Sequence, residues 1–135
     1  MDFTKQRVSQ TAPMHVRNAA GTPMYDGDKP VRIIFYGPAS RQFAELETRQ
    51  SERAVKRNND NEGKVVARSS EERRAEAVAD LLSLTAGFEN LDYEDKTGAE
   101  LYAAVYNDAE LGYILNQGVK FVGEWGNFSG SAPKN

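Results

Sequence analysis

Apolar residues at helical spacing are the feature of this sequence that most constrains its fold. In the second half of the chain they recur every three or four residues, as on the buried stripe of an amphipathic helix. Ser69 stands before one such run, with Glu72 three residues later, which is the pattern of a capping box. The runs and the breaks between them predict helices over four segments: residues 40–58, 70–88, 98–107 and 108–125.

The strongest strand signal lies in the first half of the chain. Residues 31–36 are mostly β-branched or aromatic, and Gly37-Pro38 ends the run. Its apolar residues do not alternate cleanly, so we expect both faces of this strand to be covered. Asp26-Gly27, just before it, is a common hairpin-turn pair. We therefore predict an α+β fold that is mainly helical, with a small N-terminal β-hairpin or short sheet over residues 14–36, followed by about four helices.

The 135 residues fit a single domain. Residues 1–13 are polar and show no periodicity, which predicts a flexible N-terminal arm. Residues 14–128 are the expected folded domain, and the polar residues 129–135 the expected flexible C-terminal tail. A cluster of Asn, Asp and Gly over residues 58–63 predicts a break between two helices and mobility there. The sequence leaves open whether residues 58–68 become ordered on binding.

The residue types needed for catalysis or metal binding are scarce. The chain contains no Cys and one His, His15, so a disulfide scaffold, a thiol nucleophile and a multi-His metal centre are excluded. The glycine-rich phosphate loops and the nucleophile elbow have no match in the sequence. We expect a protein that is not an enzyme and that carries no cofactor and no metal.

Neither a membrane span nor a signal peptide is predicted. No apolar run approaches the roughly 20 residues that cross a bilayer. Residues 1–10 are polar and lack the apolar centre of a signal peptide. The expected protein is soluble and intracellular, with no membrane partner.

An acidic loop over residues 90–96 invites a calcium-binding interpretation. An EF-hand loop that starts at Asn90 would need Gly at its sixth position and Glu at its twelfth. Those positions hold Asp95 and Leu101, so the pattern fails at both. A solvated acidic loop is the expectation here.

Basic residues gather between positions 49 and 68, where they could contact phosphates. They are Arg49, Arg53, Lys56, Arg57, Lys64 and Arg68. Acidic residues are interleaved with them, and the isoelectric point of about 5.2 opposes a dedicated nucleic-acid binder. We expect no nucleic-acid partner and a solvated helix in this region.

Charge is divided unevenly along the chain. Positions 1–68 carry 12 basic and 8 acidic residues, whereas positions 69–135 carry 5 basic and 12 acidic residues. Either the two halves present surfaces for different partners, or they attract each other or are simply solvated.

Large aromatic and apolar residues are concentrated in the second half of the chain. Most of them are candidates for the core, but some could line a groove for a partner helix. The candidate partner-binding residues are Phe88, Leu91, Tyr93, Tyr102, Trp125 and Phe128.

Four short stretches carry a resemblance to a known family. They are Ala-Gly-Phe-Glu-Asn-Leu at 86–91, Leu-Tyr at 101–102, Leu-Gly-Tyr-Ile-Leu-Asn-Gln-Gly-Val-Lys-Phe-Val at 111–122 and Asn-Phe at 127–128. Together they resemble the C-terminal half of the tail assembly chaperones of long-tailed bacteriophages. In the first half, the β segment 31–38 and the charged helix with Phe43 resemble the same family. The likeness spans residues 31–128. It departs at Phe88, where many relatives have Trp, and in the acidic loop, which lacks the family's Gly.

The resemblance implies a function that needs no catalytic residue. Such chaperones coat the tape measure protein, a very long helical and apolar chain, and keep it soluble in the host cell cytoplasm. They also help to recruit tail tube protein subunits, which displace them, so the chaperone is not expected in the mature virion. A surface with an apolar groove and a charged rim would suit this role. Self-association is left open as a further contact.

Three other functions compete with this expectation. The first alternative is a permanent structural protein of a phage tail, neck or baseplate, for which the polar N-terminal arm could interlock subunits. A small nucleic-acid-binding regulator comes next. An enzyme ranks last, because the residues for acid–base or nucleophilic catalysis are missing.

Overall fold

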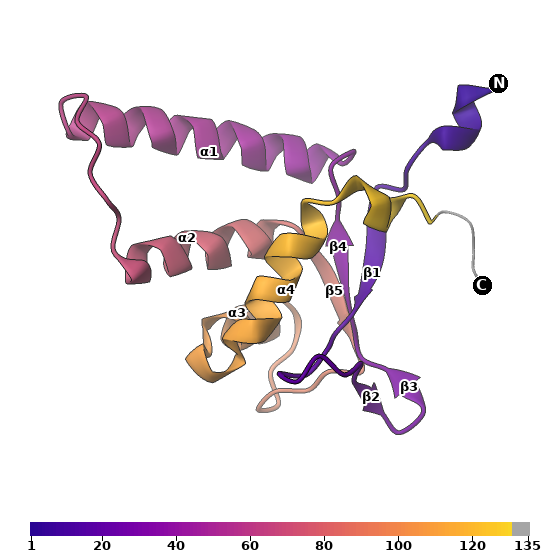
Figure 1. Ribbon diagram of the computed structural model, residues 1–135. Helices are drawn as coiled ribbons and strands as arrows, with labels where there is room; N and C mark the ends of the chain where they lie inside the picture. The colour runs from indigo at the N-terminus through magenta and orange to yellow at the C-terminus, as the bar shows by residue number, and fades with distance from the viewer. Residues whose placement is uncertain (131–135) are drawn as a thin grey trace.

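The computed structural model describes residues 1–130, and these form a mainly helical α+β fold. Four α-helices pack with a three-stranded antiparallel sheet, as predicted (Figure 1). The helices are α1 (Arg41–Asp60), α2 (Ser70–Ser83), α3 (Gly98–Asn107) and α4 (Gly112–Val122). The strands are β1 (Thr11–His15), β2 (Tyr25–Asp26), β3 (Lys29–Pro30), β4 (Arg32–Tyr36) and β5 (Thr85–Glu89). Three 3₁₀ turns complete the described residues: η1 (Phe3–Gln6), η2 (Ala109–Leu111) and η3 (Trp125–Phe128).

The sheet has the order β1-β4-β5, with β4 in the centre and antiparallel to both neighbours. Side chains alternate along β4, so Ile33 and Phe35 are buried whereas Arg32, Ile34 and Tyr36 are only partly covered. Both faces of β4 are thus covered as expected, one completely and the other in part. The face with Ile33 and Phe35 packs into a core that includes residues of α2, α3 and α4, and the other face is only partly covered.

The third strand comes from a part of the chain that was expected to be helical. Helix α2 ends at Ser83 rather than at residue 88, and β5 follows it directly. The Thr85 hydroxyl donates to the Leu81 carbonyl at 2.8 Å and Phe88 pairs with Ile33 of β4. Thr and Gly within residues 85–89 are weak helix formers, and the strand partner supplies hydrogen bonds that one more helical turn would otherwise make.

The N-terminal boundary also differs from the prediction. Strand β1 begins at Thr11, and Ala12 is buried, so residues 11–13 belong to the sheet and not to the expected arm. Before it, Val8 packs against the core and the Ser9 backbone N–H donates to the Phe128 carbonyl at 2.8 Å. The expected β-hairpin near Asp26 is present as β2-β3, which forms a separate two-stranded sheet.

The other helix predictions are close to the structure. Ser40 caps α1 and the Ser69–Glu72 capping box is formed at α2. The third helix has the predicted bounds, Gly98–Asn107. The final helix, expected over residues 108–125, is divided into η2, α4 and η3. The Asp108 side chain caps the first turn, and α4 ends at Val122 with Gly123 as its C-cap. Of the expected tail 129–135, residues 131–135 lie outside the described part.

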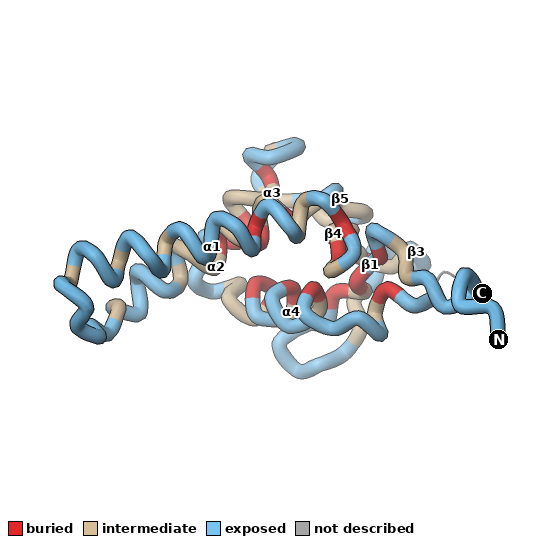
Figure 2. Tube along the Cα trace, turned by 90° about the horizontal axis from the view of Figure 1, so that it is seen from above, coloured by how far each residue is buried: buried red, intermediate tan, exposed pale blue. Residues whose placement is uncertain are grey.

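Helix α1 is joined to the rest of the molecule by little apolar contact. Among its 20 residues only Leu46 is buried. Figure 1 and Figure 2 show α1 running antiparallel to α2 and extending away from the sheet, with the connection 61–69 at the far end. A helix with one buried residue is held mainly by polar contacts along its length, and those contacts line the site described next.

Candidate partner-binding site

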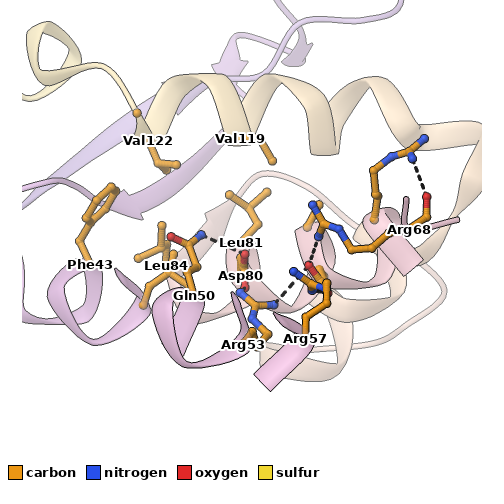
Figure 3. A pocket seen from close by; sticks show the side chains of 15 residues that line it. Phe43, Gln50, Arg53, Arg57, Arg68, Asp80, Leu81, Leu84, Val119 and Val122 are labelled. Atoms are coloured by element: carbon orange, nitrogen blue, oxygen red, sulfur yellow. Dashed lines mark hydrogen bonds and ion pairs between the residues drawn. The ribbon is translucent and has the colours of Figure 1, made fainter. Parts of the chain in front are cut away.

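A groove of about 500 Å³ lies between α1, α2 and α4 (Figure 3). Its floor is apolar, and four arginines are among the polar residues of its walls. We call it the α1–α2 groove. The apolar lining residues are Phe43, Leu46, Ala77, Leu81, Leu84, Val119 and Val122. The polar lining residues are Gln50, Arg53, Arg57, Arg68, Arg73, Glu76 and Asp80.

The apolar floor continues the hydrophobic core to the surface. Leu46, Leu81 and Leu84 are buried, whereas Phe43 is half-buried and Val119 is 46 % exposed. Exposed valine beside a concave apolar surface is what a partner side chain would cover. The groove therefore has a buried apolar base with an accessible edge on α4.

An ion-pair network forms the wall between α1 and α2. Arg53 contacts Asp80 at 2.7 Å and Arg57 contacts Glu76 at 2.5 Å. Arg68, from the connection before α2, also pairs with Glu76. These side chains are about one-quarter to one-third exposed, so solvent screens them less than it screens a surface pair. The network holds the second half of α1 where apolar contacts are lacking.

Arginines outnumber carboxylates around the groove. Four arginines line it, but only Glu76 and Asp80 carry negative charge there. Arg73 donates to the Arg68 carbonyl at 2.8 Å and forms no ion pair among residues 1–130. Each guanidinium offers five N–H donors, so donors remain after both carboxylates are satisfied. The groove can accept further carboxylate groups.

The six sequence-predicted partner residues lie elsewhere. Phe88 in β5 packs on Tyr102 and Tyr106 of α3, with ring centroids 4.5 and 5.9 Å apart. Leu91 and Tyr93 are half-buried against the same core. The Tyr93 hydroxyl donates to Asp108 at 3.0 Å, and that hydrogen bond raises the Tyr93 pKa. Phe88 and Tyr102 thus pack on one another at the edge of the core, and Leu91 and Tyr93 each pack against that core.

The last two candidates have opposite surroundings. Phe128 is 1 % exposed and packs so closely on Gly37 that a β-carbon at position 37 would lie 2.4 Å from its ring. Trp125, three residues earlier in the same 3₁₀ turn, is 58 % exposed. Phe128 is therefore a core residue, and Trp125 is the one candidate of the six whose side chain is mostly accessible. Neither lines the α1–α2 groove.

Sequence reasoning missed the groove although one signal was present. Phe43, Leu46, Gln50, Arg53 and Arg57 follow one another at spacings of three and four residues, so they share one face of α1. This stripe changes from apolar to basic along the helix, and it is the face that lines the groove. From the sequence, the arginines were considered as phosphate contacts and the basic helix 41–57 as a second candidate surface, for tail tube subunits; neither interpretation joined them to an apolar floor.

The described residues show no arrangement typical of a metal centre. Residues 1–130 contain no group of three or more His, Cys, Asp or Glu side chains placed to hold an ion. His15 Nε2 lies 2.8 Å from the Met24 carbonyl oxygen, and its ring meets Tyr25 edge-on. The histidine thus has structural contacts at the base of the β2-β3 hairpin.

The comparisons add no relative. A scan against protein-family models and searches of the curated proteins and of the solved structures found no match. Within the described part of the chain, no helix combines the length and apolar character needed to cross a membrane.

Proposed function

We propose that this protein is a non-enzymatic phage tail assembly chaperone, which binds apolar helical segments of a tape measure protein in the α1–α2 groove. The observation that supports the proposal is an apolar floor, open at Val119, beside a charged wall on a small domain. A long apolar helix aggregates in water unless its exposed stripe is covered. Many copies of a small grooved domain would cover it and keep the chain soluble until tail tube subunits arrive.

The size of the groove suits a temporary complex. A helix with side chains is about 10 Å wide, so two turns occupy roughly 850 Å³ as a cylinder. The groove of about 500 Å³ admits the side chains of one helix face but not a whole helix. Each contact would therefore be modest, and stability of the coat would come from many copies on one long chain. Modest single contacts allow tube subunits to displace the chaperone.

A second candidate is a permanent structural protein of a phage tail, neck or baseplate. The N-terminal segment favours it, since η1 stands away from the body with Phe3 74 % exposed. An exposed aromatic residue on a projecting segment could anchor in a neighbouring subunit. Such an anchor would persist in finished particles.

Co-expression with the tape measure protein of the same phage tests the proposal. We expect the tape measure protein to become soluble and to co-purify, and this chain to be absent from purified particles. Val119→Glu places a charge at the accessible edge of the groove and should abolish co-purification. Val55→Glu is the matched control, because Val55 is 61 % exposed on α1 and does not line the groove. Presence of the chain in particles at fixed stoichiometry would favour the structural candidate.

A further inference from the structure

The α1–α2 groove is polarised along its length. Phe43, Leu84 and Val122 lie at one end, and Arg57 and Arg68 at the other (Figure 3). On α1 the step from Leu46 to Arg57 covers eleven residues, which is about 16 Å at 1.5 Å per residue. A ligand that follows the groove therefore passes from an apolar environment to a cationic one within about three helical turns.

The cationic end has donors to spare for another carboxylate. Glu76 accepts from both Arg57 and Arg68, and Arg53 lies 3.9 Å from it. Arg73, beside Arg68, pairs with no carboxylate in residues 1–130 and points its Nη1 at a backbone carbonyl. The charged residues that line the groove are four arginines against two acids. A carboxylate from a partner would meet guanidinium groups already held in place, which lowers the entropy cost of the contact.

We infer that the groove recognises an amphipathic helix in which an apolar stripe is followed, about three turns along, by Asp or Glu side chains. This inference rests on the proposed function for the kind of partner and adds the chemistry of the segment that is bound. The apolar side chains fill the end near Phe43 and Val122. The carboxylates reach Arg57, Arg68 and Arg73, where they share guanidinium donors with Glu76.

Fluorescence anisotropy with labelled synthetic helices of about 18 residues tests the inference. One peptide carries a Leu stripe followed by Glu residues, and a second has Lys at each Glu position. We expect the Glu peptide to bind about tenfold more tightly, and its affinity to fall as salt rises. Equal affinities, or a preference for Lys, would overturn the inference.

Arg73→Gln is the informative variant, because it removes a charge from the groove without breaking an ion pair of the described residues. We expect it to weaken binding of the Glu peptide about fivefold and to leave binding of the Lys peptide unchanged or slightly stronger, because a like charge is removed. Lys29→Gln removes the same charge from the β2-β3 hairpin and should change neither affinity. If the two variants behave alike, Arg73 takes no part and the inference is wrong.

Failure of the inference can be told apart from failure of the proposed function. If the tape measure protein co-purifies but neither peptide binds, the chemistry assigned to the groove is wrong and the chaperone function stands. If the Glu peptide binds selectively while the tape measure protein stays insoluble, the groove chemistry holds and the proposed function falls. Sedimentation of the chain alone provides a further outcome, because a dimer lost on Val119→Glu would make a second copy the occupant and overturn the inference.

Discussion

Gly118 on α4 lies directly against Leu81 on α2. A β-carbon at position 118 would be 2.6 Å from Leu81 Cδ2 and 2.9 Å from Phe35 Cζ. Helices α2 and α4 and the central strand β4 thus meet at a point where a β-carbon would force Leu81 and Phe35 to shift. This contact sets the floor of the α1–α2 groove, because Leu81 lines the groove and is 2 % exposed.

We expect Gly118→Ala to destabilise the fold by about 2 kcal/mol, since the added methyl group overlaps a packed leucine and the end of a buried ring. Gly112→Ala is the matched control within the same helix, because nothing lies within 4 Å of its added β-carbon. The control should be neutral or stabilising by up to about 1 kcal/mol, as alanine favours helix. Urea unfolding followed by circular dichroism measures both. Equal stability of the two variants would contradict the packing described here.

The sequence predicted local structure well and long-range contacts poorly. The capping box at Ser69 and the bounds of α3 were predicted, because both depend on residues close together in the chain. Strand β5 was missed, because its pairing with β4 joins Phe88 to Ile33 across more than 50 positions, and Leu81 and Phe88 also fit a helical stripe. Tertiary pairing overrides such a local pattern.

The candidate site was harder still to predict. The α1–α2 groove combines residues from α1, α2, α4 and the connection before α2. No local pattern shows which helix faces come together. Large aromatic residues were chosen instead, and the structure shows why that choice favours the core, since Phe128 and Tyr106 are almost fully buried. Trp125 was the exception, because its side chain is 58 % exposed.

The capping box makes stability depend on pH at acidic values. Hydrogen bonds with Ser69, first to its backbone N–H, hold the pKa of Glu72 below its ordinary value of 4.5. A lowered folded-state pKa means that this contribution is present above the unfolded pKa and is lost as pH falls through the folded pKa. Glu72→Gln should therefore unfold at a lower temperature than wild type at neutral pH. The difference should shrink on acidification, and thermal scans over pH 7 to 2 would show it.

Glu71→Gln separates the effect of the capping box from the effect of negative charge at the N-terminus of α2. Glu71 lies in the same first turn of α2 but makes none of the capping-box hydrogen bonds. We expect it to lower the melting temperature less than Glu72→Gln at neutral pH. A glutamine at position 72 can still accept from the Ser69 N–H, so equal destabilisation would mean that helix-end charge, rather than the charged acceptor of the capping box, is responsible.

Stability should also decline at alkaline pH, because of Tyr106. Burial raises the pKa of its hydroxyl above the ordinary value of 10.0, and the ring is 0 % exposed. The Thr85 hydroxyl lies 2.8 Å away and donates to Leu81, so Tyr106 donates to Thr85. The unfolded chain loses this proton above pH 10 while the folded chain keeps it, so stability falls as pH rises beyond that point.

Tyr106→Phe should remove the part of the alkaline loss of stability that Tyr106 causes. It should also lower the stability at neutral pH by about 1 kcal/mol, because the hydrogen bond to Thr85 is lost. Tyr25→Phe, on an exposed ring of the hairpin, should leave stability at neutral pH unchanged within about 0.5 kcal/mol. Urea unfolding at pH 8 and pH 11 compares the variants. An unchanged alkaline decline in Tyr106→Phe would show that this tyrosine does not contribute to it.

The Glu76 network should control the mobility of α1. Glu76→Gln leaves Arg57 and Arg68 without their shared carboxylate, and we expect a loss of about 1–2 kcal/mol. Amide hydrogen exchange in the second half of α1 should become faster, since only Leu46 in the first half is buried. Asp60→Asn breaks an exposed pair with Lys56 and should cost less than about 0.5 kcal/mol. Similar exchange in both variants would mean that apolar contacts hold α1.

Trp125 and Phe128 offer the clearest separation of surface from core among the residues proposed from sequence. Phe128→Ala removes a ring that is 1 % exposed and packs on Gly37, so we expect a loss of about 3–4 kcal/mol. Trp125→Ala removes a ring that is 58 % exposed and should leave stability within about 0.5 kcal/mol of wild type. Because Trp125 does not line the α1–α2 groove, we expect Trp125→Ala to keep the wild-type melting temperature and to co-purify as much tape measure protein as wild type. A folded Trp125→Ala protein that co-purifies less tape measure protein would instead show that the binding surface extends to Trp125, outside the groove.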